Sequence, residues 1–571
     1  MVEFTAVPPA LVVLAAALVV PPLSRRVGHA IGAAATAIVA VWSHGVPAGA
    51  YLETTFLGFD AVLFNVDEFS RLMGIIFGLI GTAAVIYSYA SDADNAQTAY
   101  ALSYVGTSLG AVFAGDWLTL LFFWELMAIT STLLVWHYGG EAVRAGFRYA
   151  LLHGIGGSLF MAAIIWHYVA VGSFLFSAAN GITAGVPGVL AAIGIGVNVG
   201  FVGLHAWLPD TYPRPHLAAS VFLCVYTTKT GVYGMYRAFP DGGLAIAYMG
   251  GAMAVFGAGF ALLQNDMRRL LSYHIQSQVG YMIAGVGIPS ALATAGAMAH
   301  VYNHILYKSL LFMTAGVIIY RTGGENLKKV GGLGRKMPLT AGAFAVAALS
   351  ISGFPGFNGF VSKGMITAAA HKKHIDPLFW LLMIGGVGTF MSFIKFGYYA
   401  FLHGDYDGPV KDANALQSVA MLSVAGLCVL YGVYPEALFE LLPLHGEWEA
   451  HPYTLAHVGE VLVIAAVALV GFALLKKPLE TYGGGVPDID AVYNPAAFYG
   501  TRGLVVGVTE LYAAVDRVAV AGADAATDAV ARLGRGVVTL ADGRELELRT
   551  DIRNGVLLVV GTLVVALVVV L

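Results

Sequence analysis

Apolar runs of about 20 residues recur along almost the whole chain, and they constrain its fold more than any other feature. A membrane-spanning helix needs about 20 consecutive apolar residues. The composition agrees, because 58% of the 571 residues are hydrophobic and only 11% are charged, which is unlike a soluble globular domain. The sequence therefore predicts an all-α polytopic membrane protein with about 16 transmembrane helices, at residues 5–22, 28–44, 68–90, 98–114, 116–138, 144–170, 186–207, 216–237, 243–263, 269–288, 291–320, 338–370, 377–402, 413–434, 455–475 and 553–571.

Lysine and arginine residues are distributed unequally between the predicted loops. Twelve stand in odd-numbered connections, and three, Arg237, Lys372 and Lys373, stand in even-numbered ones. Positive residues accumulate on the cytoplasmic side of a membrane. We therefore expect the odd connections inside and both termini outside. The first apolar run lacks a basic start and a small-residue cleavage site, so we expect a retained helix, not a signal peptide.

Two predicted helices are interrupted by glycine and proline. The first break contains Gly200, Gly203 and three prolines, and the second is the run Gly353-Phe-Pro-Gly-Phe-Asn-Gly359. Backbone freed at membrane depth needs partners from protein or water. A pair of broken helices five helices apart favours two inverted repeats, as in transporters. The predicted repeats, each of five helices with the breaks in helices 7 and 12, are residues 98–237 and 243–402. An ordinary kink remains the alternative for either break alone.

The remaining segments surround these two repeats. Residues 1–97 hold three helices and an extramembrane hairpin near 51–64, and residues 403–475 hold helices 14 and 15. Residues 476–552 are predicted to form a loop and one lateral amphipathic helix from Pro495 to Leu533, followed by the last span at 553–571. Polar residues mark one stripe of that helix: Glu510, Arg517, Asp524, Asp528 and Arg532. Two short helices broken at Gly522 are the alternative.

Three ionisable residues interrupt the apolar stretch from Ala299 to Ile319. His300, His304 and Lys308 are four residues apart, which places them on one face of a helix. A charge near the centre of a bilayer costs at least ~2.5 kcal/mol, so such groups face protein or water. A column of them suggests a proton path, and polar contact between helices is the alternative.

Further ionisable residues stand in other apolar runs: Glu125, Lys229, His274, Lys363 and Lys395. Desolvation favours the neutral form of each group, and a nearby opposite charge favours the ionised form. The proton affinity of each group then depends on the state of its neighbours, as a relay requires. Static buried ion pairs are the alternative, although such pairs seldom add much stability.

The sequence predicts no cofactor and no metal site. Its two cysteines, Cys224 and Cys428, are far apart and form no Cys-x-x-Cys motif. The net charge of −4 argues against nucleic acid as a partner.

Several sequence motifs together resemble those of the antiporter-like membrane subunit shared by complex I, membrane-bound hydrogenases and Mrp-type sodium/proton antiporters. The resemblance covers roughly residues 60–400. The motifs are Phe123-Trp-Glu-Leu126, His205-Ala-Trp-Leu-Pro-Asp210, Asn265-Asp-Met-Arg-Arg-Leu-Leu-Ser-Tyr273, Ser277-Gln-Val-Gly-Tyr281, His300-Val-Tyr-Asn-His-Ile-Leu-Tyr-Lys-Ser-Leu-Leu-Phe312, Gly332-Leu-Gly-Arg-Lys-Met-Pro338 and Gly353-Phe-Pro-Gly-Phe-Asn-Gly-Phe-Val-Ser-Lys363.

The resemblance implies roles for particular residues. Glu125 matches the family glutamate that modulates nearby lysines, and Lys229 matches the lysine of helix 8. His300, His304 and Lys308 match the central relay, and Lys363 matches the terminal lysine of helix 12. Lysine at position 363 is typical of the D-type antiporter subunit, and the motif that begins at His274 also resembles that subunit most. His205, His274 and Lys395 are further candidates.

The sequence departs from the family pattern at Asn198. The family has a lysine there, on broken helix 7, so Glu125 lacks its usual partner. We expect Lys229 to take that place, or the first half to conduct differently.

The resemblance implies a proton-translocating subunit of a multi-subunit monovalent cation (sodium)/proton antiporter in the plasma membrane of a prokaryote. Its partners would be other subunits, protons, sodium and the lipid bilayer. Two alternatives use the same scaffold. One is a proton-pumping subunit of a complex I-like or hydrogenase oxidoreductase, and the other is a bicarbonate-uptake partner.

Overall fold

The computed structural model describes residues 7–482, 487–533, 538–539, 545–546 and 552–570. The chain divides into two compact units, residues 1–487 and 488–571, and each is described by itself. Residues 483–486 of the predicted loop, and the first two residues of the predicted helix 5–22, lie outside the described residues.

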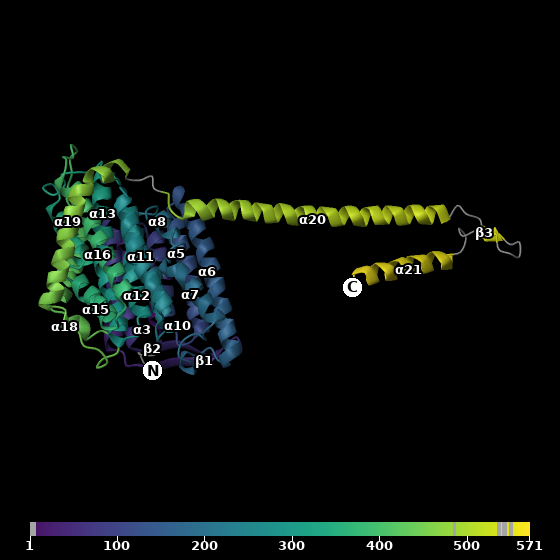
Figure 1. The fold of residues 1–571 in the computed structure, drawn as a ribbon, viewed down its shortest axis with the longest axis horizontal. Coiled ribbons are helices and arrows are strands. Elements are labelled where there is room, and N and C mark those ends of the chain that lie inside the picture. The colour runs from purple at the N-terminus through teal and green to yellow at the C-terminus, as the bar shows by residue number, and fades with distance from the viewer. Residues whose placement is uncertain (1–6, 483–486, 534–537, 540–544, 547–551, 571) are drawn as a thin grey trace. The chain divides into compact units, whose positions relative to one another are not determined.

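The first unit is a bundle of helices with one small hairpin (Figure 1). Its described helices begin and end as follows: α1 Pro9–Val19, α2 Arg25–Gly45, α3 Glu68–Ala90, α4 Asn95–Val112, α5 Trp117–Trp136, α6 Glu141–Val171, α7 Val186–Val199, α8 Trp207–Thr211, α9 Leu217–Leu223, α10 Tyr226–Ala238, α11 Leu244–Leu263, α12 Met267–Gly287, α13 Ala291–Thr322, α14 Pro338–Ser352, α15 Asn358–Lys372, α16 Asp376–Gly397, α17 Ala415–Val433, α18 Glu436–Phe439 and α19 Leu455–Tyr482.

These helices confirm a polytopic membrane fold. Within the described residues, nine helices are long and apolar enough to cross a membrane, and α1, α7 and α14 are shorter apolar helices. One predicted helix, 216–237, is instead two helices, α9 and α10, separated at Cys224 and Val225. This break carries no signal in the sequence because neither residue is a glycine or proline. The π-helix η3, Tyr398–Leu402, follows α16 directly.

The predicted hairpin is present as antiparallel strands β1, Gly49–Phe56, and β2, Phe59–Val66. Leu57 and Gly58 both have positive φ, 51° and 85°. A two-residue turn with positive φ at both residues has a backbone twist that matches the twist of the two strands it joins. The hairpin and α18 lie at the same end of the bundle (Figure 1).

The two predicted repeats share one local motif at the start of their second helix. Asp116 precedes α5 and Asp266 precedes α12, and each carboxylate accepts a hydrogen bond from the backbone N–H three residues on, at 2.7 Å and 2.8 Å. Each aspartate also forms an isolated antiparallel bridge with the loop after the following helix, to Leu175 and Asn326 respectively. The same chain path is therefore built twice.

A second shared motif lies at the helix breaks. Gly200 ends α7 and Gly353 ends α14, with φ of 75° and 81°. The following Phe201 and Phe354 each donate a backbone hydrogen bond of 2.9 Å to the carbonyl five residues earlier. This is the Schellman arrangement, in which glycine adopts the left-handed conformation that closes a helix. The match supports the predicted repeats, and the boundaries 98–237 and 243–402 stay predictions.

Helix α13 is the centre of the first unit. Every residue from Leu292 to Ile319 is buried. The helix contacts α3, α9, α12, α14, α15 and α17. Because it is enclosed on all sides, its polar side chains can face only other helices.

The second unit contains α20, Asp490–Leu533, the strand pair Val538–Thr539 and Glu545–Leu546, and α21, Ile552–Val570. Helix α20 is continuous through Gly522, so the prediction of one long helix is confirmed. At 1.5 Å per residue its 44 residues extend about 66 Å. Arg517 and Glu510, seven residues apart on the predicted polar stripe, lie 4.0 Å from each other.

Candidate functional site

The three ionisable residues of α13 are fully buried in the centre of the bundle. His300, His304 and Lys308 are each 0% exposed. His300 is held on both sides, because its Nδ1 is 2.9 Å from Ser362 Oγ and its Nε2 is 3.3 Å from Tyr307 Oη. Neither the ring nitrogens of His304 nor the Lys308 amine has a hydrogen-bond partner among the described residues. Buried polar atoms without protein partners are where internal water is expected.

Three further buried lysines share one arrangement. Each places its Nζ against backbone carbonyls at the C-terminal end of a helix. The contacts are Lys229 with Cys224 O at 2.5 Å after α9, Lys363 with Ile351 O at 2.7 Å in α14, and Lys395 with Leu262 O at 2.8 Å and Gln264 O at 2.6 Å at the end of α11. The last carbonyls of a helix lack intrahelical donors and carry partial negative charge. The helix ends therefore stabilise an ammonium ion where no carboxylate is present.

The α9–α10 break explains the position of Lys229. The carbonyl of Cys224 is free to accept from a side chain because α9 ends at Leu223 and α10 begins at Tyr226. Lys229 also donates to Thr228 Oγ1 at 3.0 Å. The break that has no signal in the sequence is thus the feature that holds this lysine.

Two of these helix-end lysines and the α13 column form one electrostatic cluster. His304 lies within range of the charges on Lys229, Lys308, His300 and Lys363. His274 of α12 likewise lies within range of Lys308 and Lys363. We name this set of six the central cluster: Lys229, His274, His300, His304, Lys308 and Lys363. A proton arriving at one member changes the proton affinity of the next, as a relay requires.

Glu125 is not part of the central cluster. Among the described residues, no lysine, arginine or histidine lies within 4.0 Å of its carboxylate, and its buried Oε1 has no hydrogen-bond partner. It faces α6, where a Cβ on Gly157 would lie 1.6 Å from Oε1. It also lines a pocket of about 260 Å³ between α5 and α6. The Lys229 amine instead binds the Cys224 carbonyl at the end of α9, so the structure shows no direct contact between the two residues that we expect to act together. Their functional coupling stays a prediction.

The remaining candidates lie around the central cluster. Asn198 ends α7 beside Gly231 of α10, is 0% exposed, and has no described partner for either amide atom. His205 stands between α7 and α8, where its Nδ1 accepts a 3.3 Å hydrogen bond from the Gly203 N–H and its ring packs on Phe256. Lys395 is in α16 and lies outside the central cluster, and its amine binds the C-terminal end of α11.

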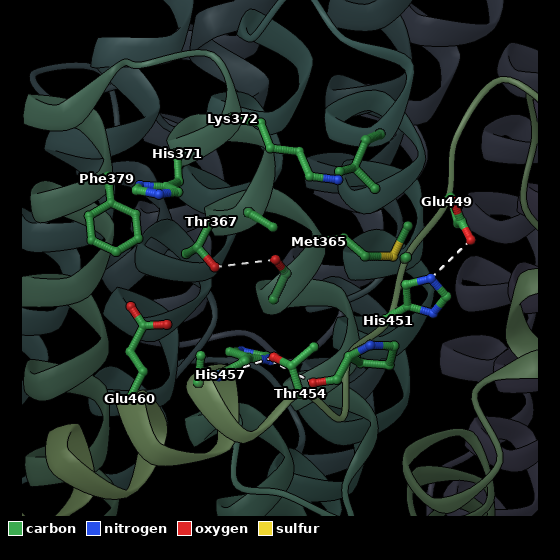
Figure 2. A pocket seen from close by; sticks show the side chains of 16 residues that line it. Met365, Thr367, His371, Lys372, Phe379, Glu449, His451, Thr454, His457 and Glu460 are labelled. Carbon is green, nitrogen blue, oxygen red and sulfur yellow. Dashed lines mark hydrogen bonds and ion pairs between the residues drawn. The ribbon is translucent and has the colours of Figure 1, made fainter.

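Two cavities lead from the end of the bundle that holds α18 toward Lys363. The outer pocket has a volume of about 600 Å³ and lies between the end of α15, the loop at 449–454 and the start of α19 (Figure 2). The inner cavity, about 40 Å³, is lined by Lys363 and Tyr281, and the lysine amine lies 4.6 Å from the centre of the Tyr281 ring. A proton route between Lys363 and this end of the bundle therefore has to pass only the side chains that separate the two cavities.

Comparison with known proteins finds related membrane subunits. Residues 114–392 match the family model described as NADH:quinone oxidoreductase/Mrp antiporter, TM. The D-type subunit of the Na(+)/H(+) antiporter of Alkalihalophilus pseudofirmus is 29% identical over 403 residues, which cover 66% of this chain and 82% of that protein. Over these residues the chain is similar to the antiporter-like membrane subunits.

Solved structures with the same fold cover more of this antiporter-like subunit. A chain of the Mrp complex from a Dietzia species superimposes with a TM-score of 0.69 at 19% identity, covering 82% of this chain and 99% of that one. A chain of the membrane-bound sulfane sulfur reductase, an archaeal respiratory membrane complex, has a TM-score of 0.71 at 24% identity and covers 99% and 100%. The second match includes the unit formed by residues 488–571.

Sequence reasoning missed several residues of this antiporter-like subunit. Ser362, Tyr307 and Tyr281 contact His300 or Lys363, and none carries a signal in sequence beyond being polar in an apolar run. A chain of hydroxyls in the first half was also missed, linking Ser131, Tyr149, Thr227 and Tyr104 at 2.9, 3.0 and 2.6 Å. Within the described residues, no group of three or more metal-binding side chains is present.

Proposed function

We propose that this antiporter-like subunit moves protons across the plasma membrane of a prokaryote as part of a multi-subunit monovalent cation/proton antiporter. The single observation that carries the proposal is the enclosed column of His300, His304 and Lys308 on α13, between lysines held at two helix breaks. Ionisable groups inside a membrane mark proton relays when they form a connected series.

In this proposal each lysine of the central cluster can both hold and release its proton. A helix-end carbonyl stabilises the charged form of Lys229 and of Lys363. The positive charges of Lys229 and Lys308 disfavour each other, so the two amines are not readily protonated at the same time. Protons therefore move one at a time along the central cluster. Glu125 acts on this cluster from a distance or through a neighbouring subunit.

The sidedness follows from the loops. With the odd connections in the cytoplasm and both termini outside, the outer pocket near Lys363 opens to the outside. The relatives assemble as subunits of larger complexes, and we propose that this chain does the same, with other subunits and the bilayer as its surroundings.

A second function has one observation in its favour. The archaeal sulfane sulfur reductase chain matches 99% of this chain, against 82% for the Mrp chain, so its match includes the unit after residue 487. The subunit would then pump protons in a complex driven by electron transfer.

One experiment separates the two functions. Everted vesicles that contain the complete complex, from a strain without other antiporters, are acidified and followed with a pH-sensitive dye. Proton release on adding Na⁺ or K⁺, with no electron donor, supports the antiporter. Proton uptake that requires an electron donor, with no response to either cation, contradicts it and supports the redox-driven complex.

A further inference from the structure

Three side chains form the wall between the outer pocket and the inner cavity beside Lys363. Thr367 of α15 and His457 and Glu460 of α19 line both spaces. Figure 2 shows all three among the side chains that line the outer pocket. Any proton that travels between Lys363 and the outer pocket passes these residues.

Close packing brings α19 against the helix that carries Lys363. A Cβ on Gly364 would lie 2.3 Å from the His457 ring, so α19 approaches α15 this closely because residue 364 has no side chain. The His457 ring also stacks on Phe360, with ring centroids 4.2 Å apart, and its Nδ1 bonds the Pro452 carbonyl at 2.9 Å. His457 is therefore fixed in place and positions the first turns of α19.

Glu460 differs from its two neighbours because its carboxylate has no ion-pair partner. It is half-buried, and within the described residues no lysine, arginine or histidine lies within 4.0 Å of it. It is also the only charged residue between Leu455 and Leu475 in an apolar helix. A carboxylate in such a helix is costly and is expected to have a function.

We propose that Glu460 exchanges the proton between Lys363 and the outer pocket. The proposal deepens the proposed function and rests on it. In the outward direction the Lys363 ammonium gives its proton to the Glu460 carboxylate, directly or through one water molecule, leaving a neutral amine and a neutral acid. The acid then releases the proton to water in the outer pocket. The titratable groups that line this pocket with Glu460 are His371, Lys372, Glu449, His451 and His457.

The proposal is tested by transport in vesicles with the assembled complex. Glu460→Gln keeps the size and removes the exchangeable proton, so we expect the rate of cation-driven proton release to fall at least tenfold. Glu460→Asp keeps the chemistry and is expected to retain more than half of the rate. Glu440→Gln is the matched control, an exposed glutamate in the connection that precedes α19 and outside both cavities, and is expected to behave as wild type. A wild-type rate for Glu460→Gln overturns the proposal.

A second measurement does not depend on antiport. In a Cys224→Ser, Cys428→Ser background, we expect Glu460→Cys to react with a membrane-impermeant thiol reagent from one side only. Leu462→Cys, at a position 47% exposed on the apolar surface, is expected to stay unlabelled in the bilayer. Failure of Glu460→Cys to react, with labelled Lys372→Cys as the positive control, overturns the inference. Labelled Glu460→Cys in a complex without cation-driven transport contradicts only the proposed function.

Discussion

The two halves of this antiporter-like protein share their architecture and differ in how their ionisable groups are connected. Both repeats place an aspartate before their second helix and a glycine-closed break in their fourth. In the second half, His274 and His304 each lie within electrostatic range of Lys308 and Lys363. In the first half, Glu125 and Asn198 have no described polar partner, and only Lys229 joins the cluster. The two halves thus share a scaffold, although the ionisable groups of the first half are less connected than those of the second.

The difference shows what a helix break does for a buried lysine. Lys229 and Lys363 both bind carbonyls freed where a helix ends. Such a partner is neutral overall and cannot take the proton, so the lysine can lose it to another group. A carboxylate partner would bind the ammonium more tightly and compete for the proton.

The largest effect that sharpens this comparison is expected at Lys229, the first-half member of the central cluster. We expect Lys229→Ala to lower the cation-driven transport rate at least tenfold in the assembled complex, because the link into the first half is lost. Asn198→Lys adds an amine beside Gly231, two residues from position 229 on α10, and is expected to restore part of that rate. Dye measurements on the single and double variants check this. Wild-type transport in Lys229→Ala would break the proposed link between the halves.

A smaller effect is expected from changing the surroundings of Glu125. Gly157→Ala would place a Cβ 1.6 Å from Oε1, so the carboxylate must move. We expect a loss of several-fold, similar to that of Glu125→Gln, if the position of this carboxylate tunes the cluster. Gly154→Ala on the same helix meets no atom within 4 Å and serves as the control. If Gly157→Ala transports as well as Gly154→Ala, the location of Glu125 is unimportant.

The smallest effect on transport is expected at Lys395. Its amine closes the end of α11 but does not reach the central cluster. Lys395→Ala leaves two buried carbonyls without this donor, which costs about 1–3 kcal/mol of stability. Thermal stability of the purified complex should fall, while transport per assembled complex stays within twofold of wild type. A tenfold loss of transport would place Lys395 in the relay.

Most of the fold could be predicted from the sequence, because apolar runs mark membrane helices directly and glycines mark their breaks. The polar column of α13 could also be predicted, since three ionisable residues at a spacing of four share one face. The α9–α10 break could not, because Cys224 and Val225 lack a helix-breaking side chain. For the same reason the carbonyl partner of Lys229 has no signal in the sequence, and the expected coupling of this lysine to Glu125 stays a prediction. Contacts between distant helices, such as that of His457 with Gly364, have no local pattern.

The central claim is that protons cross this protein through the column on α13. It is tested most directly by Lys308→Ala, with cation-driven proton movement measured by a pH-sensitive dye in everted vesicles and assembly of the complex checked on the same preparation. Lys308 is fully buried and its amine bonds no described partner, so its removal should not prevent folding. We expect an assembled complex whose transport is abolished. An assembled complex that transports at the wild-type rate would contradict the claim.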